Sequence, residues 1–322
     1  MHKKTVLLDE VDVNELPVEL VLENLKGQKY SHKIEKIDLD KVEIGRQIIF
    51  DGKAKKGKRI SPFFVCTDCH NTVKETELLK ETSPEKRLEY AQKNNLPFLQ
   101  GSTFWGIYNR TSFYNDDYIK KYKDIIKNAK DSLSNAIQVC GKYCSSGRYL
   151  NTWELEAVLH YFKKNELKIK DLSLDKKEYK NILYWQKLDS DEKKALVNKI
   201  ESAYSTAFPA TFLPTMPREQ RKYGEGGNVK NGEFIYEKSC MYCHENKRVT
   251  FLSLSKDRLS AKMFVKHLKD YSDLNLYQII RWGTYAKAGR KQYMPHYTKE
   301  KMSDQQIEDL VAYIKTLAKK SK

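Results

Sequence analysis

The side chains best suited to chemistry in this sequence are its six cysteines, and four of them fall in two identical patterns. Each pattern is Cys-x-x-Cys-His, at Cys66-Thr67-Asp68-Cys69-His70 and at Cys240-Met241-Tyr242-Cys243-His244. Two thiols three residues apart lie on one helical turn, where both can bond to the two vinyl groups of one haem. The adjacent histidine then lies under the iron as its proximal ligand. The spacing therefore predicts two covalently bound c-type haems.

Four cysteines could also form a zinc site or two disulfides, but neither needs a histidine at the same offset in both patterns. Thioether attachment of haem requires export of the chain. The basic residues Met1-His2-Lys3-Lys4 are followed by too few apolar residues for a signal peptide. We therefore expect a periplasmic or otherwise exported protein whose leader is absent from this sequence.

The segments that flank the two Cys-x-x-Cys-His patterns repeat each other. Before each pattern, a glycine is followed by an apolar turn that ends in an aromatic residue, in residues 42–50 and 228–236. After each pattern, apolar side chains recur at i, i+3, i+4 and i+7 in residues 155–162 and 307–314, which is typical of a helix with one buried face. An internal repeat of this kind predicts two similar helical units.

The order of short helix, Cys-x-x-Cys-His pattern, loops and amphipathic terminal helix resembles the class I cytochrome c fold over roughly residues 40–165 and 226–320. We therefore expect a mainly α protein with two class I cytochrome c-like domains joined by an ordered linker. The expected parts are a first domain with an N-terminal extension (1–165), a linker (166–225) and a second domain (226–322).

The lysine-rich stretch around the linker runs from Lys163 to Gly227. It is predicted to be helical around residues 179–185 and is rich in Pro and Gly over 209–227. Aromatic side chains occur throughout it, which is not typical of a free tether, so we expect it to pack on both domains. These aromatic residues are Tyr184, Trp185, Phe208 and Phe212.

The sixth ligand of the second iron is predicted to be Met294, in Tyr293-Met294-Pro295, which precedes the terminal helix at the distance typical of class I cytochromes. A methionine ligand raises the potential of the iron and leaves no open site. The nearby His267 and His296 are interpreted as surface residues.

No methionine stands at the equivalent place in the first half, because none of the six lies between Met1 and Met216. Aligning the terminal helices on Tyr161 and Tyr313 puts Lys142 opposite Met294. Lys142 lies between the two remaining cysteines, Cys140 and Cys144. A thiolate is a strong soft ligand for ferric iron and lowers its potential, so Cys140 is the predicted distal ligand.

Other arrangements stay open for the first iron. Cys140 and Cys144 could form a disulfide, which would require the helix to end near Val139. Cys144 could itself be the ligand or a group that handles substrate. His160 is expected to point off the buried face of its helix. Met216 could reach the iron from the linker.

Cys140, Gly147 and Leu150, followed by the helix at 155–162, resemble the Cys-(x)6-Gly-x-x-Leu segment of the dihaem thiosulfate dehydrogenases. More loosely they resemble the Cys-ligated cytochrome subunit of thiosulfate-oxidising systems. The resemblance implies that Cys140 binds a catalytic haem where the sulfur substrate reacts, and that the second haem passes electrons on. That family tends to carry a serine four residues after the cysteine, where this chain has Cys144, so the substrate stays open.

Three further features surround Cys140 in the sequence. Residues 116–139 carry apolar side chains at spacings of three and four, which predicts an amphipathic helix that brings Cys140 to the haem. The aromatic residues of 104–110 are interpreted as a wall that covers the haem. Arg110 and Arg148 are candidates for binding an anion near the first haem, because a guanidinium offers paired donors to an oxyanion.

Composition limits the partners. The 322 residues carry a formal net charge of +16, 40% are apolar, and mean hydropathy is -0.72. No apolar run approaches the roughly 20 residues of a membrane span, and no nucleic-acid motif is present. We expect an electron-donor or electron-acceptor protein, such as a soluble cytochrome, and a small sulfur oxyanion as partners. The expected function is a sulfur-anion oxidoreductase, and the alternative is an electron carrier without substrate chemistry.

The two Cys-x-x-Cys-His patterns lead to a direct prediction about haem content. Denatured protein should retain two haems per chain in a pyridine haemochrome assay, because thioether bonds survive unfolding. A result of one haem per chain, or haem that acidified acetone extracts, contradicts it.

Overall fold

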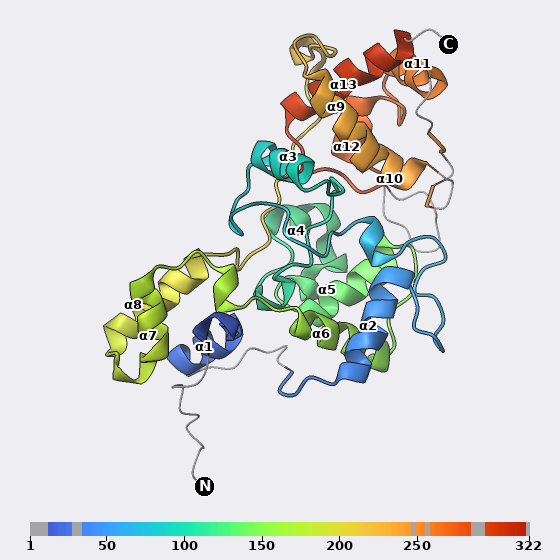
Figure 1. The fold of residues 1–322 in the computed structure, drawn as a ribbon. Helices are drawn as coiled ribbons and strands as arrows, with labels where there is room; N and C mark the ends of the chain where they lie inside the picture. Colours follow the sequence, from blue (N-terminus) through green and yellow to red (C-terminus); the bar gives the residue numbers. More distant parts are fainter. Residues whose placement is uncertain are drawn as a thin grey trace.

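The computed structural model describes residues 12–27, 34–245, 249–250, 252–254, 258–284 and 294–319, and these residues are mainly helical (Figure 1). Within these ranges there is no strand, and one isolated β-bridge pairs Pro17 with Lys168. The helices are α1 Val18–Lys26, α2 Leu39–Asp51, α3 Pro84–Lys93, α4 Asp116–Tyr122, α5 Leu133–Val139, α6 Thr152–Lys164, α7 Lys176–Leu183, α8 Ser190–Ser202, α9 Val229–Ile235, α10 Met241–His244, α11 Arg258–His267, α12 Leu276–Trp282 and α13 Asp304–Lys319.

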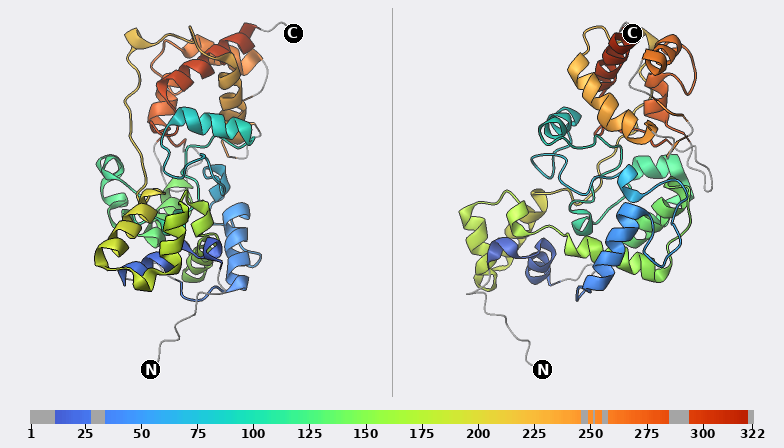
Figure 2. Two further views of the ribbon diagram at one scale, coloured as in Figure 1. Left: turned by 60° about the vertical axis from the view of Figure 1, so that its left-hand side comes forward. Right: turned by 45° about the vertical axis from the view of Figure 1, so that its right-hand side comes forward.

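The buried apolar side chains form three clusters. One lies among α2, α5 and α6, a second among α9, α11, α12 and α13, and a third among α1, α7 and α8. The views in Figure 2 place the second group of helices at one end of the molecule and α1, α7 and α8 toward the other. The first two groups each carry one Cys-x-x-Cys-His pattern, and are called here the first and second halves.

The two halves repeat one helix crossing. In the first half α2 packs on α6, and a Cβ on Gly45 would lie 2.2 Å from the carbonyl oxygen of Ala157. In the second half α9 packs on α13, and a Cβ on Gly232 would lie 2.0 Å from the carbonyl oxygen of Asp309. Only glycine lets two helix backbones approach so closely. The repeat seen in the sequence is therefore a repeat in packing.

The aromatic residues of the repeat are paired in the same way. The ring of Phe50 meets that of Tyr161 with centroids 6.3 Å apart, and the ring of Tyr236 meets that of Tyr313 at 5.6 Å. Tyr161 and Tyr313 are the residues on which the two terminal helices align. Both pairs fix the same end of the crossing.

Helix α3 belongs to the first half in sequence but packs into the core of the second. Its Leu88 and Ala91, with Phe98 from the loop that follows, join the cluster of α9 and α13. The amide of Phe98 donates to the carbonyl of Lys238 at 2.9 Å, and the hydroxyl of Ser239 donates to the carbonyl of Phe98 at 2.6 Å. The segment between α3 and residue 101 therefore joins the two halves.

A buried charge network lies at the same junction. Glu75 accepts from Arg87 at 3.1 Å and from Lys301 at 2.7 Å, and the Arg87 guanidinium lies 4.2 Å from the ring centre of Phe98. Burial opposes the charge of Glu75, but Arg87 and Lys301 hold its pKa well below the usual value. Burial also lowers the pKa of Lys301, to about 8.

The linker has two parts with different contacts. Helices α7 and α8 pack with α1. Neither α1 nor α8 was predicted from the sequence. The later part contacts both halves: Asn115 donates to the carbonyl of Ala210, and the hydroxyl of Thr211 donates to Glu300 at 2.7 Å. The linker is thus held along its length.

The single helix expected over residues 116–139 is wrong. The structure has α4, then two short 3-10 turns, then α5. Helix α4 ends at Tyr122, and the next residue, Lys123, has a φ of 48°, in the left-handed region. Ser132 begins α5 by accepting from the amide of Asn135. The apolar face persists through the break, because Ile126, Ala129 and Leu133 are all buried.

The charge network leads to a prediction about stability. Arg87→Ala leaves the Glu75 carboxylate buried beside one cation, and should lower the free energy of unfolding by roughly 3–5 kcal/mol. Denaturant unfolding of the holoprotein measures this. Arg46→Ala is the matched control, because Arg46 pairs with Glu43 at the surface, and it should cost less than about 1 kcal/mol. Equal losses in the two variants would show that the network does not stabilise the junction.

Candidate functional site

The first Cys-x-x-Cys-His pattern opens on a 3-10 turn, Cys66–Asp68, that is closed by the Asp68 carboxylate accepting from the amide of Val65 at 2.8 Å. Cys66, Cys69 and His70 line one cavity. Burial raises the pKa of the Cys66 thiol to about 12. The three side chains that the haem pattern requires therefore face a common space.

His70 is oriented by its surroundings. Its Nδ1 lies 2.6 Å from the carbonyl oxygen of Ser102, and Phe104 stacks on the ring at 4.5 Å between centroids. A carbonyl oxygen only accepts, so Nδ1 carries the proton and Nε2 keeps a free lone pair. Burial lowers the pKa of His70, which keeps the ring neutral. This is the tautomer of a histidine that ligates a metal.

The second pattern has the same arrangement. A π-helical turn, Tyr236–Cys240, leads into α10, and Cys240, Cys243 and His244 line a second cavity. The His244 Nδ1 lies 2.8 Å from the carbonyl oxygen of Leu252, so Nε2 is again free, and burial lowers the pKa of the ring. The donor sets of both patterns fit a covalently attached haem with a proximal histidine.

Met294 lines the second cavity. Its backbone is tied to the chain after α12: the amide donates to the Thr284 hydroxyl at 2.5 Å and the carbonyl accepts from the Thr284 amide at 2.8 Å. Tyr293 lies outside the described residues. Met302 lines the same cavity but is 1% exposed and belongs to the apolar core. Both methionines line the cavity, so Met294 stays the predicted ligand and Met302 is the alternative.

Cys140 and Cys144 line the first cavity together with Cys66, Cys69 and His70. Helix α5 ends at Val139 and the chain continues as one π-helical turn, Cys140–Cys144. The two sulfurs are not joined as a disulfide. Their mutual hydrogen bond, together with burial, raises the pKa of Cys140 well above its usual value. Single π turns in a helix are frequent at functional sites.

The two candidate arginines differ. All five N–H groups of Arg148 are used: two donate to the Glu154 carboxylate at 2.6 and 2.7 Å, and three to backbone carbonyls of Lys58, Arg59 and Tyr149. No donor is left for an anion, so this geometry argues against that role for Arg148.

Among the described residues, no hydrogen-bond acceptor is found for the Nη1 of Arg110. Arg110 is 9% exposed, and burial lowers its pKa to about 10. Its guanidinium lies 5.3 Å from the ring centre of Phe208, which lines the first cavity. Arg110 therefore keeps the capacity to bind an anion beside this cavity.

Of the histidines outside the two patterns, His160 and His296 are buried, contrary to prediction. His160 is buried rather than directed off the core, but it accepts from the amide of Asp38 at 3.2 Å and does not line the first cavity. His267 lies at the end of α11 beside Asp270. His296 is not a surface residue: it is 8% exposed and lines the first cavity. Met216 packs against the core of the second half and does not line the first cavity.

Three tyrosines of the first cavity were missed. Tyr114, Tyr118 and Tyr122 line it, and they follow one another at intervals of four residues. That spacing is a helical stripe, and it was available in the sequence as a signal. Of the aromatic residues predicted to cover the haem, Phe104 lines the cavity, whereas Trp105 and Tyr108 do not.

The two cavities share a wall. Phe64, Cys69, Gln100 and Pro295 line both. The Cys-x-x-Cys-His patterns also touch directly: the hydroxyl of Tyr242 donates to the carbonyl of Thr67 at 3.2 Å, and the Cys243 sulfur lies 3.6 Å from the carbonyl oxygen of Asp68. The two candidate sites are next to each other rather than at separate ends of the halves.

Residues 227–314 match the family described as cytochrome C oxidase, cbb3-type, subunit III. This part of the chain is a c-type cytochrome domain. It contains Cys240, Cys243, His244 and Met294, so the domain binds haem c covalently and has a haem-based electron-transfer function. Comparisons with curated proteins and with solved structures gave no match. In the described residues, no helix is both long and apolar enough to cross a membrane.

The cytochrome domain leads to a prediction for Met294. Met294→Leu removes the thioether while keeping the apolar volume, so one haem should lose its sixth-ligand spectral features and its reduction potential should fall. Optical spectra and a redox titration measure both. Met302→Leu is the control, because it alters the same cavity without removing the proposed ligand. If Met302→Leu causes the loss and Met294→Leu does not, Met302 is the ligand.

Proposed function

We propose that the chain is a dihaem c-type cytochrome that acts on a sulfur anion of the thiosulfate or tetrathionate type. The proposal assigns one class I cytochrome c-like domain to each half, within residues 1–165 and 226–322, with 166–225 as linker. The first haem is held by Cys66, Cys69 and His70. The observation that carries the catalytic part is the presence of Cys140 in the same cavity as that haem site.

The haem, when bound, supplies one-electron oxidation and reduction at its iron. Cys140 is the proposed distal ligand, since its thiol faces the cavity from the π-helical turn. The hydrogen bond with Cys144 and burial raise the pKa of the Cys140 thiol, and a ferric iron bound here would favour its thiolate form. Cys144 is the hydrogen-bond partner of Cys140 and is placed to hold or release it.

The reaction balances over two electrons. In the oxidative direction two thiosulfate ions each give up one electron, one S–S bond forms between them, and no proton is released. The electrons leave one at a time toward the second site and a partner protein. The contact between Cys243 and Asp68 supports this route, because it puts the two haem attachments side by side. The reductive direction takes two electrons from the partner.

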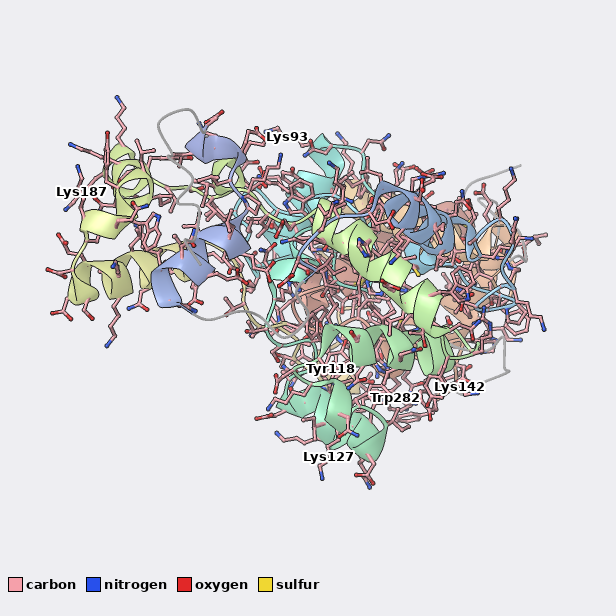
Figure 3. All side chains as sticks on the ribbon, turned by 90° about the horizontal axis from the view of Figure 1, so that it is seen from below. Lys93, Tyr118, Lys127, Lys142, Lys187 and Trp282 are labelled. Atoms are coloured by element: carbon pink, nitrogen blue, oxygen red, sulfur yellow. The ribbon has the colours of Figure 1, made fainter. Side chains whose placement is uncertain are left out.

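The charge of the surface supports an acidic redox protein as that partner. Exposed lysines are spread around the molecule, among them Lys93, Lys127 and Lys187 in Figure 3, and the formal net charge is +16. An excess of one sign speeds the encounter with a protein of the opposite sign. We place this encounter in the periplasm or another exported compartment, because haem attachment through thioethers requires it. Arg110 is the proposed anion-binding residue near the first haem.

A carrier without substrate chemistry is the second candidate. It is favoured by the pairing of Arg148 with Glu154, which leaves this guanidinium no donor for a substrate anion. The contact between the two attachment sites serves a carrier equally well. Turnover is what separates the two: a carrier exchanges electrons with proteins but is not reduced by thiosulfate at catalytic rates.

Cys140→Ala tests the catalytic role. It should abolish thiosulfate turnover and remove the thiolate features from the spectrum of one ferric haem, while the other haem keeps its spectrum. Cys144→Ser keeps a hydrogen-bonding group of similar size and should have the milder effect. Steady-state kinetics and electron paramagnetic resonance measure the outcome. If the effects of the two variants are reversed, Cys144 is the ligand; if neither changes a spectrum, the carrier function is the better one.

A further inference from the structure

One short segment reaches both cavities. Met294 and Pro295 line the second cavity, and Pro295 and His296 line the first. The proposed ligand of the second haem is therefore two residues away from a side chain in the wall of the first site. No other three consecutive described residues line the two cavities in this way.

The segment is tied along its length to the end of α12. Thr284 bonds Met294 through both its amide and its hydroxyl, the His296 Nδ1 lies 2.5 Å from the carbonyl oxygen of Trp282, and the amide of Tyr297 donates to Ile280 at 2.9 Å. Pro295 fixes one of the two intervening φ angles. Because the backbone between them is held in this way, a displacement of Met294 also displaces His296.

Gly283 makes this close contact possible. Its φ of 58° is left-handed, and a Cβ there would lie 2.3 Å from the carbonyl oxygen of Met294 and 2.8 Å from the His296 Nδ1. Any other residue would push the segment away from α12. The end of α12 thus holds Met294 and His296 at once.

His296 in turn holds the distal wall of the first site. Since the Nδ1 proton goes to Trp282, Nε2 accepts from the hydroxyl of Tyr122 at 2.5 Å. The ring of Phe212 packs edge-on against His296 at 5.1 Å, and Tyr122 lines the cavity that contains Cys140.

We propose that Tyr122 and His296 are positioning residues that transmit the ligation of the second iron by Met294 to the distal side of the first site. The proposal rests on the proposed function, because it needs a haem at each site. Binding of Met294 sets the segment 294–296, the segment sets His296, and the Tyr122 hydroxyl follows His296. If haem is bound at both sites, the Tyr122 hydroxyl would take up this position when Met294 ligates the second iron.

The test is a double-mutant cycle on the holoprotein with Tyr122→Phe and Met294→Leu. Tyr122→Phe removes one hydroxyl. It should raise the KM for thiosulfate on the order of fivefold and shift the paramagnetic resonance signal of the first haem, while the signal of the second haem is unchanged. Met294→Leu should change both signals. In the Tyr122→Phe background, Met294→Leu should change only the signal of the second haem.

Tyr118→Phe is the matched control. Tyr118 lines the same cavity from α4, but its hydroxyl does not bond His296, so the effect of Met294→Leu on the first haem should survive in that background. The proposal is overturned if Met294→Leu shifts the first-haem signal equally with and without the Tyr122 hydroxyl, since direct haem–haem interaction then explains it.

Failure of the proposed function looks different. If Met294→Leu changes neither signal, Met294 is not a ligand, and both the second-site assignment and the transmission are overturned. If the two signals respond as expected but thiosulfate is not turned over, the carrier function holds. The transmission is then read from the signals and from the reduction potential of the first haem alone.

Discussion

The contact between the two Cys-x-x-Cys-His patterns is the constraint on which the rest of the structure depends. Cys69 lines both cavities, and Cys243 meets the backbone of Asp68 across their shared wall. The two Cys-x-x-Cys-His patterns can stay in contact only if the halves that carry them do not move apart. The structure meets this condition in two ways: Leu88, Ala91 and Phe98 of the first half pack into the apolar core of the second, and the buried Glu75 pairs with Arg87 and Lys301 across the junction.

The buried charges at the junction have a structural role, because they come from both halves. Glu75 and Arg87 come from the first half and Lys301 from the second, so the network forms only when the halves are in register. Asn71, the residue after His70, also donates to Glu75 at 2.7 Å. Burying charges costs free energy, and what such a network offers in return is a specific geometry. Here that geometry fixes the loop that follows the first histidine.

How much of this could be predicted from the sequence depended on the range of the interactions. The Cys-x-x-Cys-His patterns and the repeat around Gly45 and Gly232 are local signals, and the mainly helical fold that they indicated is confirmed. The packing of α3 into the other half and of α1 onto α8 depends on contacts far apart in sequence, which periodicity does not encode. The prediction of one helix over 116–139 failed for a different reason. The apolar spacing continues past Tyr122, but the helical backbone ends there.

The candidate site divides in the same way. The alignment on Tyr161 and Tyr313 led to Cys140, and the structure places that residue in the first cavity, although the ligand itself stays a prediction. His296 was wrongly predicted to lie at the surface. The sequence gives no signal for which cavity a histidine two residues from Met294 faces. Its position follows from Gly283 and the carbonyl of Trp282, which turn the chain so that neighbours in sequence serve different sites. A repeat that places one Cys-x-x-Cys-His pattern in each half does not show that residues of one half line the cavity of the other. In this structure they do, because Pro295 and His296 of the second half line the first cavity.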